Sequence, residues 1–179
     1  NQISIKIGLE CEYFEKYMPW LKKTLKKYPI DYIILGNHFD DTDETGIYFG
    51  RPLTQQQLMK YVDNCIKAIH SGLYSYVAHP DLACYKTDDP FYHQEMKKLC
   101  LAAMEANMPL EFNLLGYSTN RHYPNTTFFK IAKEVGNKVI IGTDAHESSA
   151  LLDMQTYQQA KALLEQMGLE LTEEIKFLR

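Results

Sequence analysis

The chain has 179 residues, of which 45% are apolar and 23% are charged, and its formal net charge at neutral pH is −4. This composition is ordinary for one soluble globular domain spanning residues 1–179, and the acidic balance excludes the basic surface that binding to long nucleic acid requires. No apolar run reaches the ~18 residues of a membrane span and no signal peptide is present, so we expect a cytoplasmic protein without membrane contact.

Cysteine usage and the first residues add two expectations. The four cysteines stand far apart, and no pair has Cys-x-x-Cys spacing. We therefore expect reduced thiols in the core of a cytoplasmic protein. The chain opens on Asn1 without an initiator methionine and already inside an alternating apolar pattern. We expect that sequence upstream of it is missing.

The first half of the chain alternates between strand-like and helix-like segments. Ile3–Leu9 has an apolar residue at every second position, which predicts a strand. Apolar residues three and four apart predict a helix over about residues 14–25. The compact apolar run Ile30–Leu35 predicts a buried second strand, Thr54 is placed to cap the next helix, and Tyr74–Ala78 is the third predicted strand.

The second half continues the same alternation. Pro90 is at a position typical of the first turn of a helix, and Leu110–Leu115 is the fourth predicted strand. Asn125 is placed to cap the following helix, Lys138–Ile141 begins the fifth strand, and a last helix is expected from about Ala150. The order βαβαβαβαβα predicts a parallel sheet covered by helices, either open or closed into a barrel.

Two observations favour the barrel. Neither a Gly-x-Gly-x-x-Gly sequence nor a P-loop follows the first strand, which disfavours the open sheets that bind nucleotides. Polar residues gather instead where strands end, and barrels of the TIM type carry their chemistry at the C-terminal ends of the strands. The sequence therefore predicts an α/β barrel with its site at that edge.

Metal-binding side chains follow four of the five predicted strands. Glu10 ends the first strand, His38 follows the second and His79 follows the third. Asp144 and His146 come two residues apart after the fifth strand, so they share a face. Carboxylates and imidazoles are the ligands of Zn, Mn and Fe. Because parallel strands end at one edge, we expect a metal site there.

Each residue also has an ordinary explanation when it is taken alone. Glu10 could be a solvated loop carboxylate, His38 could bind a backbone carbonyl, and His79 could belong to a simple turn. Glu111, on an apolar strand, is harder to explain this way, because a buried carboxylate needs a partner or a proton. Ligand-type groups at the ends of four strands favour one shared site over independent coincidences.

Five segments, in order along nearly the whole chain, resemble the motifs of the PHP (polymerase and histidinol phosphatase) superfamily. They are Gly8-Leu9-Glu10, Gly36-Asn37-His38-Phe39, Ala78-His79-Pro80-Asp81, Glu111-Phe112-Asn113 and Gly142-Thr143-Asp144-Ala145-His146. The Gly-x-His-Phe form resembles the histidinol-phosphatase branch. The resemblance implies an α/β fold, a distorted (βα)7 TIM-like barrel of the PHP type, which here lacks about the first two strands.

The resemblance also implies cofactors and ligands. A complete site would hold up to three divalent metal ions, Zn, Mn or Fe. Glu10 would bridge two of them, and His38 and His79 would complete the ligands of one. Asp144 would bind the second metal and His146 the third, and either of these two would also serve catalysis by protonating the leaving group.

Three further residues are expected to contact the substrate. The resemblance places Asn113 and the loop after it along the substrate site. Arg121 is the candidate for the phosphate group, because a guanidinium binds two phosphate oxygens at once. Arg51, in the loop after the His38 strand, is the competing candidate.

The implied activity is metal-dependent hydrolysis of a small phosphorylated substrate, L-histidinol phosphate, to L-histidinol and phosphate in histidine biosynthesis. The chain departs from the family where the first two strands would bring a His-x-His pair, and on its own it is expected to lack full activity. One alternative is a non-catalytic PHP metal-binding or scaffolding module. Another is a PHP phosphoesterase acting on a small nucleotide. The sequence leaves the oligomeric state open.

Overall fold

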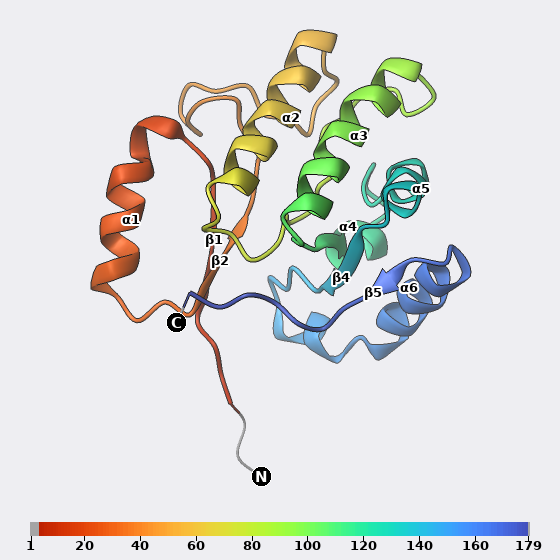
Figure 1. Ribbon diagram of the computed structural model, residues 1–179. Helices are drawn as coiled ribbons and strands as arrows, with labels where there is room; N and C mark the ends of the chain where they lie inside the picture. Colours follow the sequence, from red (N-terminus) through yellow and green to blue (C-terminus); the bar gives the residue numbers. More distant parts are fainter. Residues whose placement is uncertain (1–3, 179) are drawn as a thin grey trace.

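A computed structural model of the protein describes residues 4–178 and shows strands and helices in alternation (Figure 1). The strands are β1 (Gly8–Cys11), β2 (Tyr32–Leu35), β3 (Leu110–Asn113), β4 (Lys138–Gly142) and β5 (Glu170–Leu171). The α-helices are α1 (Met18–Lys27), α2 (Gln55–His70), α3 (Pro90–Glu105), α4 (Leu114–Ser118), α5 (Thr126–Val135) and α6 (Met154–Gln166). Short 3-10 helices, η1 (Glu15–Tyr17) and η2 (Ser148–Leu152), precede α1 and α6. The predicted α/β class is confirmed.

All pairings between the strands are parallel. β1 pairs with β2, and β4 lies between β3 and β5. The segment 74–78 joins the two groups, because Val77 forms parallel bridges with Leu35 of β2 and with Leu110 of β3. This segment is the predicted third strand. It lies between β2 and β3 in the position of a strand, but it is joined to them by isolated bridges and not by a continuous ladder of hydrogen bonds.

The sheet is open within residues 4–178. β1 pairs only with β2 and β5 only with β4, so the described residues do not close the expected (βα)7 barrel. Ile3, the first residue of the predicted first strand, lies outside the described residues. Ile5 and Ile7 are 79% and 54% exposed, because no strand among residues 4–178 covers them, and regular pairing begins only at Gly8.

The fourth predicted strand is shorter than expected. It ends at Asn113, and the next two leucines, Leu114 and Leu115, belong to helix α4. The physical reason is a helix cap: the side-chain oxygen of Asn113 accepts a hydrogen bond from the backbone N–H of Gly116 at 2.8 Å. An apolar pattern alone does not separate this short buried helix from a continued strand.

The predicted caps of the longer helices are confirmed. Thr54 and Gln57 form a reciprocal capping box at the start of α2, and Asn125 caps α5. Gly136 ends α5 with φ of +87°, a left-handed conformation that favours glycine.

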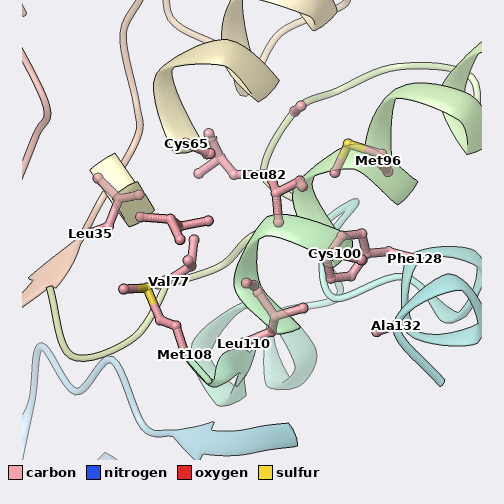
Figure 2. Packing of buried hydrophobic residues seen from close by; sticks show 14 of the residues in the cluster. Leu35, Cys65, Val77, Leu82, Met96, Cys100, Met108, Leu110, Phe128 and Ala132 are labelled. Atoms are coloured by element: carbon pink, nitrogen blue, oxygen red, sulfur yellow. The ribbon is translucent and has the colours of Figure 1, made fainter. Parts of the chain in front are cut away.

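The core lies between the sheet and the helices on its outer face. Leu35, Val77 and Leu110 are neighbours across the sheet, and Figure 2 shows them in one cluster with Cys65 of α2 and Cys100 of α3. All four cysteines are free thiols, as predicted, but only Cys65 and Cys100 lie in the core, and Cys11 and Cys84 are partly exposed. None of the helices in residues 4–178 has the length and apolar character needed to cross a membrane.

The segment 172–178 covers the end of the sheet opposite to the predicted site. After β5 the chain turns back beneath the strands (Figure 1). Ser75 donates its hydroxyl to the carbonyl of Lys176, and the backbone N–H of Leu178 donates to the carbonyl of Asp31. The N-terminal ends of the central strands are therefore covered, and the C-terminal ends carry the polar residues.

Candidate metal centre

Three of the predicted ligands meet at the C-terminal edge of the sheet. Glu10 comes from β1, His38 from the loop after β2, and His79 from the end of the segment 74–78. The Nε2 atoms of His38 and His79 lie 3.5 Å and 3.1 Å from Oε1 of Glu10. One ligand atom from each residue lies within 4.8 Å of the others, so the three could hold one metal ion. We call these residues the triad.

A glycine allows the triad to come together. A Cβ added at Gly36 would lie 2.1 Å from Oε1 of Glu10 and 2.7 Å from Cε1 of His38. Any larger residue would push these two ligands apart. The glycine two residues before His38 is therefore part of the site, and not only of the turn after β2.

Glu12 contacts His38 on the side away from the triad. Its two carboxylate oxygens accept from the backbone N–H of His38 at 3.0 and 3.1 Å. Oε1 of Glu12 also lies 2.9 Å from Nδ1 of the same histidine. Sequence reasoning missed this residue. Its signal was the spacing Glu10-Cys11-Glu12, which puts two carboxylates on the same face of an extended segment.

A chain of hydrogen bonds links His79 to Asp144. The backbone N–H of His79 donates to Oε2 of Glu111 at 2.8 Å, and Nδ2 of Asn113 donates to the same oxygen at 3.0 Å. Nδ2 of Asn113 also donates to Oδ2 of Asp144 at 3.1 Å. Gly142 makes room for this chain, because a Cβ there would lie 1.8 Å from Oε1 of Glu111. The buried Glu111 thus has the partners that its position requires.

Asn113 lies inside the protein. Its side chain is fully buried, its oxygen caps α4, and its nitrogen bonds Glu111 and Asp144. Both polar atoms of the Asn113 side chain therefore already have hydrogen-bond partners within the protein. The residue predicted to line the substrate site is therefore placed to orient Asp144.

Asp144 and His146 lie at the same edge but outside the triad. Asn113 links Asp144 to Glu111, and Nδ1 of His146 lies 3.6 Å from Oδ1 of Asp144, which places both near the site. His146 is turned to solvent, with 73% of its side chain exposed, and its Nδ1 lies 2.9 Å from the carbonyl oxygen of Asp144. His79 and Asp144 both have positive φ, +30° and +46°, a backbone strain that is often found at functional residues.

The electrostatic environment favours positive charge at His79. Burial by itself would lower the pKa of His79, but the hydrogen bond to Glu10 and the negative charges of Glu111, Glu10 and Asp144 outweigh it and raise that pKa. The hydrogen bond with His79 lowers the pKa of Glu10 in spite of burial. Burial raises the pKa of Glu111, and it raises the pKa of Asp81 to about 7.

The loop that carries Arg121 is attached to the turn that carries His79. Nε2 of His122 lies 2.7 Å from the carbonyl oxygen of Leu82, which can only accept, so Nε2 carries the proton. Asp81 is fully buried, and its Oδ2 accepts from the backbone N–H and Nδ2 of Asn125 at 2.6 and 3.1 Å. These bonds fix both ends of the loop.

Within this loop, the side chain of Arg121 is held by a hydrogen bond to Tyr123. Its Nη1 donates to the hydroxyl of Tyr123 at 2.7 Å, and the buried ring of Tyr123 lies 5.7 Å from the ring of His79. The hydrogen bond to Tyr123 thus holds the Arg121 guanidinium near the ring that packs on His79. Arg51 is exposed, and its side chain forms no ion pair within residues 4–178.

The triad suits a divalent transition metal. Two imidazole nitrogens and one carboxylate oxygen lie within 4.8 Å of one another, and nitrogen with oxygen ligands suits zinc as well as manganese or iron. His79 and Glu10 share a hydrogen bond whose proton a metal would replace.

Sequence comparison finds no matching family model and no similar curated protein. Comparison of structures finds similar folds. The crystal structure of histidinol phosphate phosphatase from Lactococcus lactis, complexed with zinc, L-histidinol and phosphate, aligns with 99% of this chain and 73% of that chain, at 19% identity and a TM-score of 0.70. A proposed histidinol phosphatase from Listeria monocytogenes aligns with 83% of this chain and 66% of that chain, at 16% identity and a TM-score of 0.58. At these identities the likeness establishes a shared fold.

Proposed function

We propose that this protein is a metal-dependent phosphomonoester hydrolase and that its substrate is L-histidinol phosphate. The observation that carries the proposal is the convergence of Glu10, His38 and His79 on one point at the C-terminal edge of a parallel sheet. The similar fold of an enzyme that binds zinc, L-histidinol and phosphate supports it. The motifs that resemble those of the PHP histidinol phosphatases lie at the same edge.

In the proposed mechanism, a metal held by the triad would supply Lewis acidity for the phosphate oxygens and lower the pKa of a water molecule. The residues of the chain bind and orient the substrate. Arg121 would hold the phosphate oxygens that do not react, since its guanidinium lies near Asp144 and is directed by Tyr123.

Proton transfer completes the proposed reaction. Water forms a new bond to phosphorus, the ester P–O bond breaks, and the leaving alkoxide takes a proton. Asp144 would take the proton that the attacking water loses and pass it to the leaving alkoxide, because Asn113 orients its carboxylate at the edge that carries the triad. His146 is the second candidate, because its exposed side chain can reach a substrate that enters from solvent.

One observation favours a second function. Asp144 and His146 lie outside the triad. Residues 4–178 therefore contain one cluster of possible ligands, enough for one metal and not for three. A non-catalytic metal-binding module would need no more than this. It would bind zinc with the triad and show no turnover.

A phosphate-release assay decides between these functions. We expect the zinc-loaded protein to release phosphate from L-histidinol phosphate faster than from an aliphatic phosphate monoester without the imidazole ring, and faster than from a nucleoside monophosphate. A chelator should abolish the release, and added zinc should restore it. Turnover that persists after the metal is removed would exclude the proposed mechanism. Zinc binding without any turnover would favour the non-catalytic module.

A further inference from the structure

Glu12, which is not a proposed metal ligand, contacts His38, which is one. The carboxylate of Glu12 holds both the backbone N–H and the ring Nδ1 of His38. Glu12 is itself anchored, since the hydroxyl of Tyr74 donates to its carbonyl oxygen at 3.0 Å. Only 20% of the Glu12 side chain is exposed. The carboxylate therefore lies on an anchored segment and not on a free surface chain.

This contact determines which ring nitrogen of His38 is free. A carboxylate accepts hydrogen bonds and has none to donate, so in the neutral imidazole the proton sits on Nδ1. The lone pair is then on Nε2, which lies 3.5 Å from Oε1 of Glu10. The ring is thus set in both tautomer and direction before any metal arrives.

His79 provides the contrast. Its Nε2 also faces Glu10, but its Nδ1 is buried and has no hydrogen-bond partner among the described residues. Packing holds that ring, which is 5.7 Å from Tyr123 and 4.8 Å from His38. His38 is 29% exposed in its side chain and is less confined, so it depends more on a bonded partner.

We infer that Glu12 is a positioning residue that holds His38 ready for metal binding. This inference rests on the proposed metal-dependent function and adds to it a residue that does not touch the metal. A carboxylate behind a ligating histidine fixes its tautomer and orientation and makes the ring more basic. Loss of such a partner typically lowers metal affinity by about 10–100-fold.

Zinc affinity, measured by competition with a chromophoric chelator, tests the inference. Glu12→Ala should weaken zinc binding by about 10–100-fold. Glu12→Gln should weaken it less, because the amide oxygen still accepts from Nδ1 of His38. Glu15→Gln is the matched control: it removes the same charge three residues further on, from an exposed side chain, and should leave affinity within about twofold. Equal affinities for Glu12→Ala and the control would overturn the inference.

Two further readouts separate a positioning role from other roles. In the metal-free protein, ¹⁵N NMR should show the Nδ1–H tautomer of His38, and Glu12→Ala should shift the population toward the Nε2–H tautomer. With cobalt in place of zinc, the absorption bands of Glu12→Gln should keep the wild-type pattern. An unchanged tautomer in Glu12→Ala would overturn the inference, and so would a changed coordination number in Glu12→Gln, which would mean that Glu12 is itself a ligand.

The failure of this inference differs from the failure of the proposed function. Wild-type protein that binds zinc and hydrolyses L-histidinol phosphate, with Glu12→Ala binding zinc equally well, would overturn the role of Glu12 alone. Weaker zinc binding in Glu12→Ala, together with no hydrolysis by the wild type, would support the role of Glu12 and contradict the proposed enzyme.

Discussion

Glu10→Gln is expected to weaken zinc binding by more than about 100-fold and to abolish phosphate release. Zinc sites with four protein ligands bind with about 10–16 kcal/mol, so one ligand contributes about 3 kcal/mol. Glu10 is the residue that both histidines of the triad face, at 3.1 and 3.5 Å from Oε1. Its replacement removes the negative charge that offsets the charge of the metal, and a neutral amide is a much weaker ligand for zinc.

This variant has a matched control and an internal check. Glu44→Gln removes one charge from an exposed loop residue and should leave zinc affinity unchanged. In the metal-free Glu10→Gln protein, the pKa of His79 should fall, because the hydrogen bond and charge of Glu10 are among the causes that raise it. NMR titration measures that pKa. Wild-type zinc affinity in Glu10→Gln would mean that the metal is bound elsewhere.

Arg121→Ala is expected to lower kcat/KM for L-histidinol phosphate by about 100-fold or more, the size of effect found when one preorganised donor to the transition state is removed. The Tyr123 hydroxyl accepts a hydrogen bond from the guanidinium, and the ring of Tyr123 lies 5.7 Å from the ring of His79. Arg121→Lys should recover part of the loss, since an ammonium keeps the charge without the paired donors. Steady-state kinetics measure the effect, and zinc affinity should not change.

Arg51 decides whether this assignment is correct. The sequence left both arginines as candidates, and within residues 4–178 the side chain of Arg121 donates a hydrogen bond to Tyr123, whose ring packs on His79. A large loss of kcat/KM in Arg51→Ala, with little effect in Arg121→Ala, would contradict the assignment. A loss of kcat/KM in both would mean that the phosphate group is shared between the two loops.

The sequence was enough to predict the triad for a general reason. Parallel strands that alternate with helices end at one edge, so residues just after consecutive strands must lie near one another. Glu10, His38 and His79 follow three neighbouring strand segments, and they do converge. Asp144 and His146 follow β4, which lies further along the sheet. They reach the same edge without joining the triad.

Contacts between distant segments could not be predicted in this way. Glu12 binds a histidine 26 residues away, and that pairing depends on the register of β1 against β2, in which Cys11 lies opposite Leu35. A shift of one residue would turn Glu12 to the other face of the sheet. The sequence pattern shows which face is apolar, but it does not give the register of two short strands.

The barrel was the least predictable part of the fold. Alternating strands and helices are equally consistent with an open or a closed parallel sheet, and the choice depends on which strands pair at the two edges. Within residues 4–178, β1 and β5 stay unpaired on their outer sides. The alternating apolar residues predicted a strand from Ile3 onward. With the sheet open at this side, Ile5 and Ile7 are exposed instead of buried.

The most direct test of the central claim is anomalous X-ray scattering at the zinc edge from crystals of the zinc-loaded protein. We expect a peak bonded to the carboxylate of Glu10 and to Nε2 of both His38 and His79, with Nδ1 of His38 still on Glu12. A peak bonded to other residues would contradict the metal centre described above. So would zinc-saturated crystals in which these three side chains point away from one another.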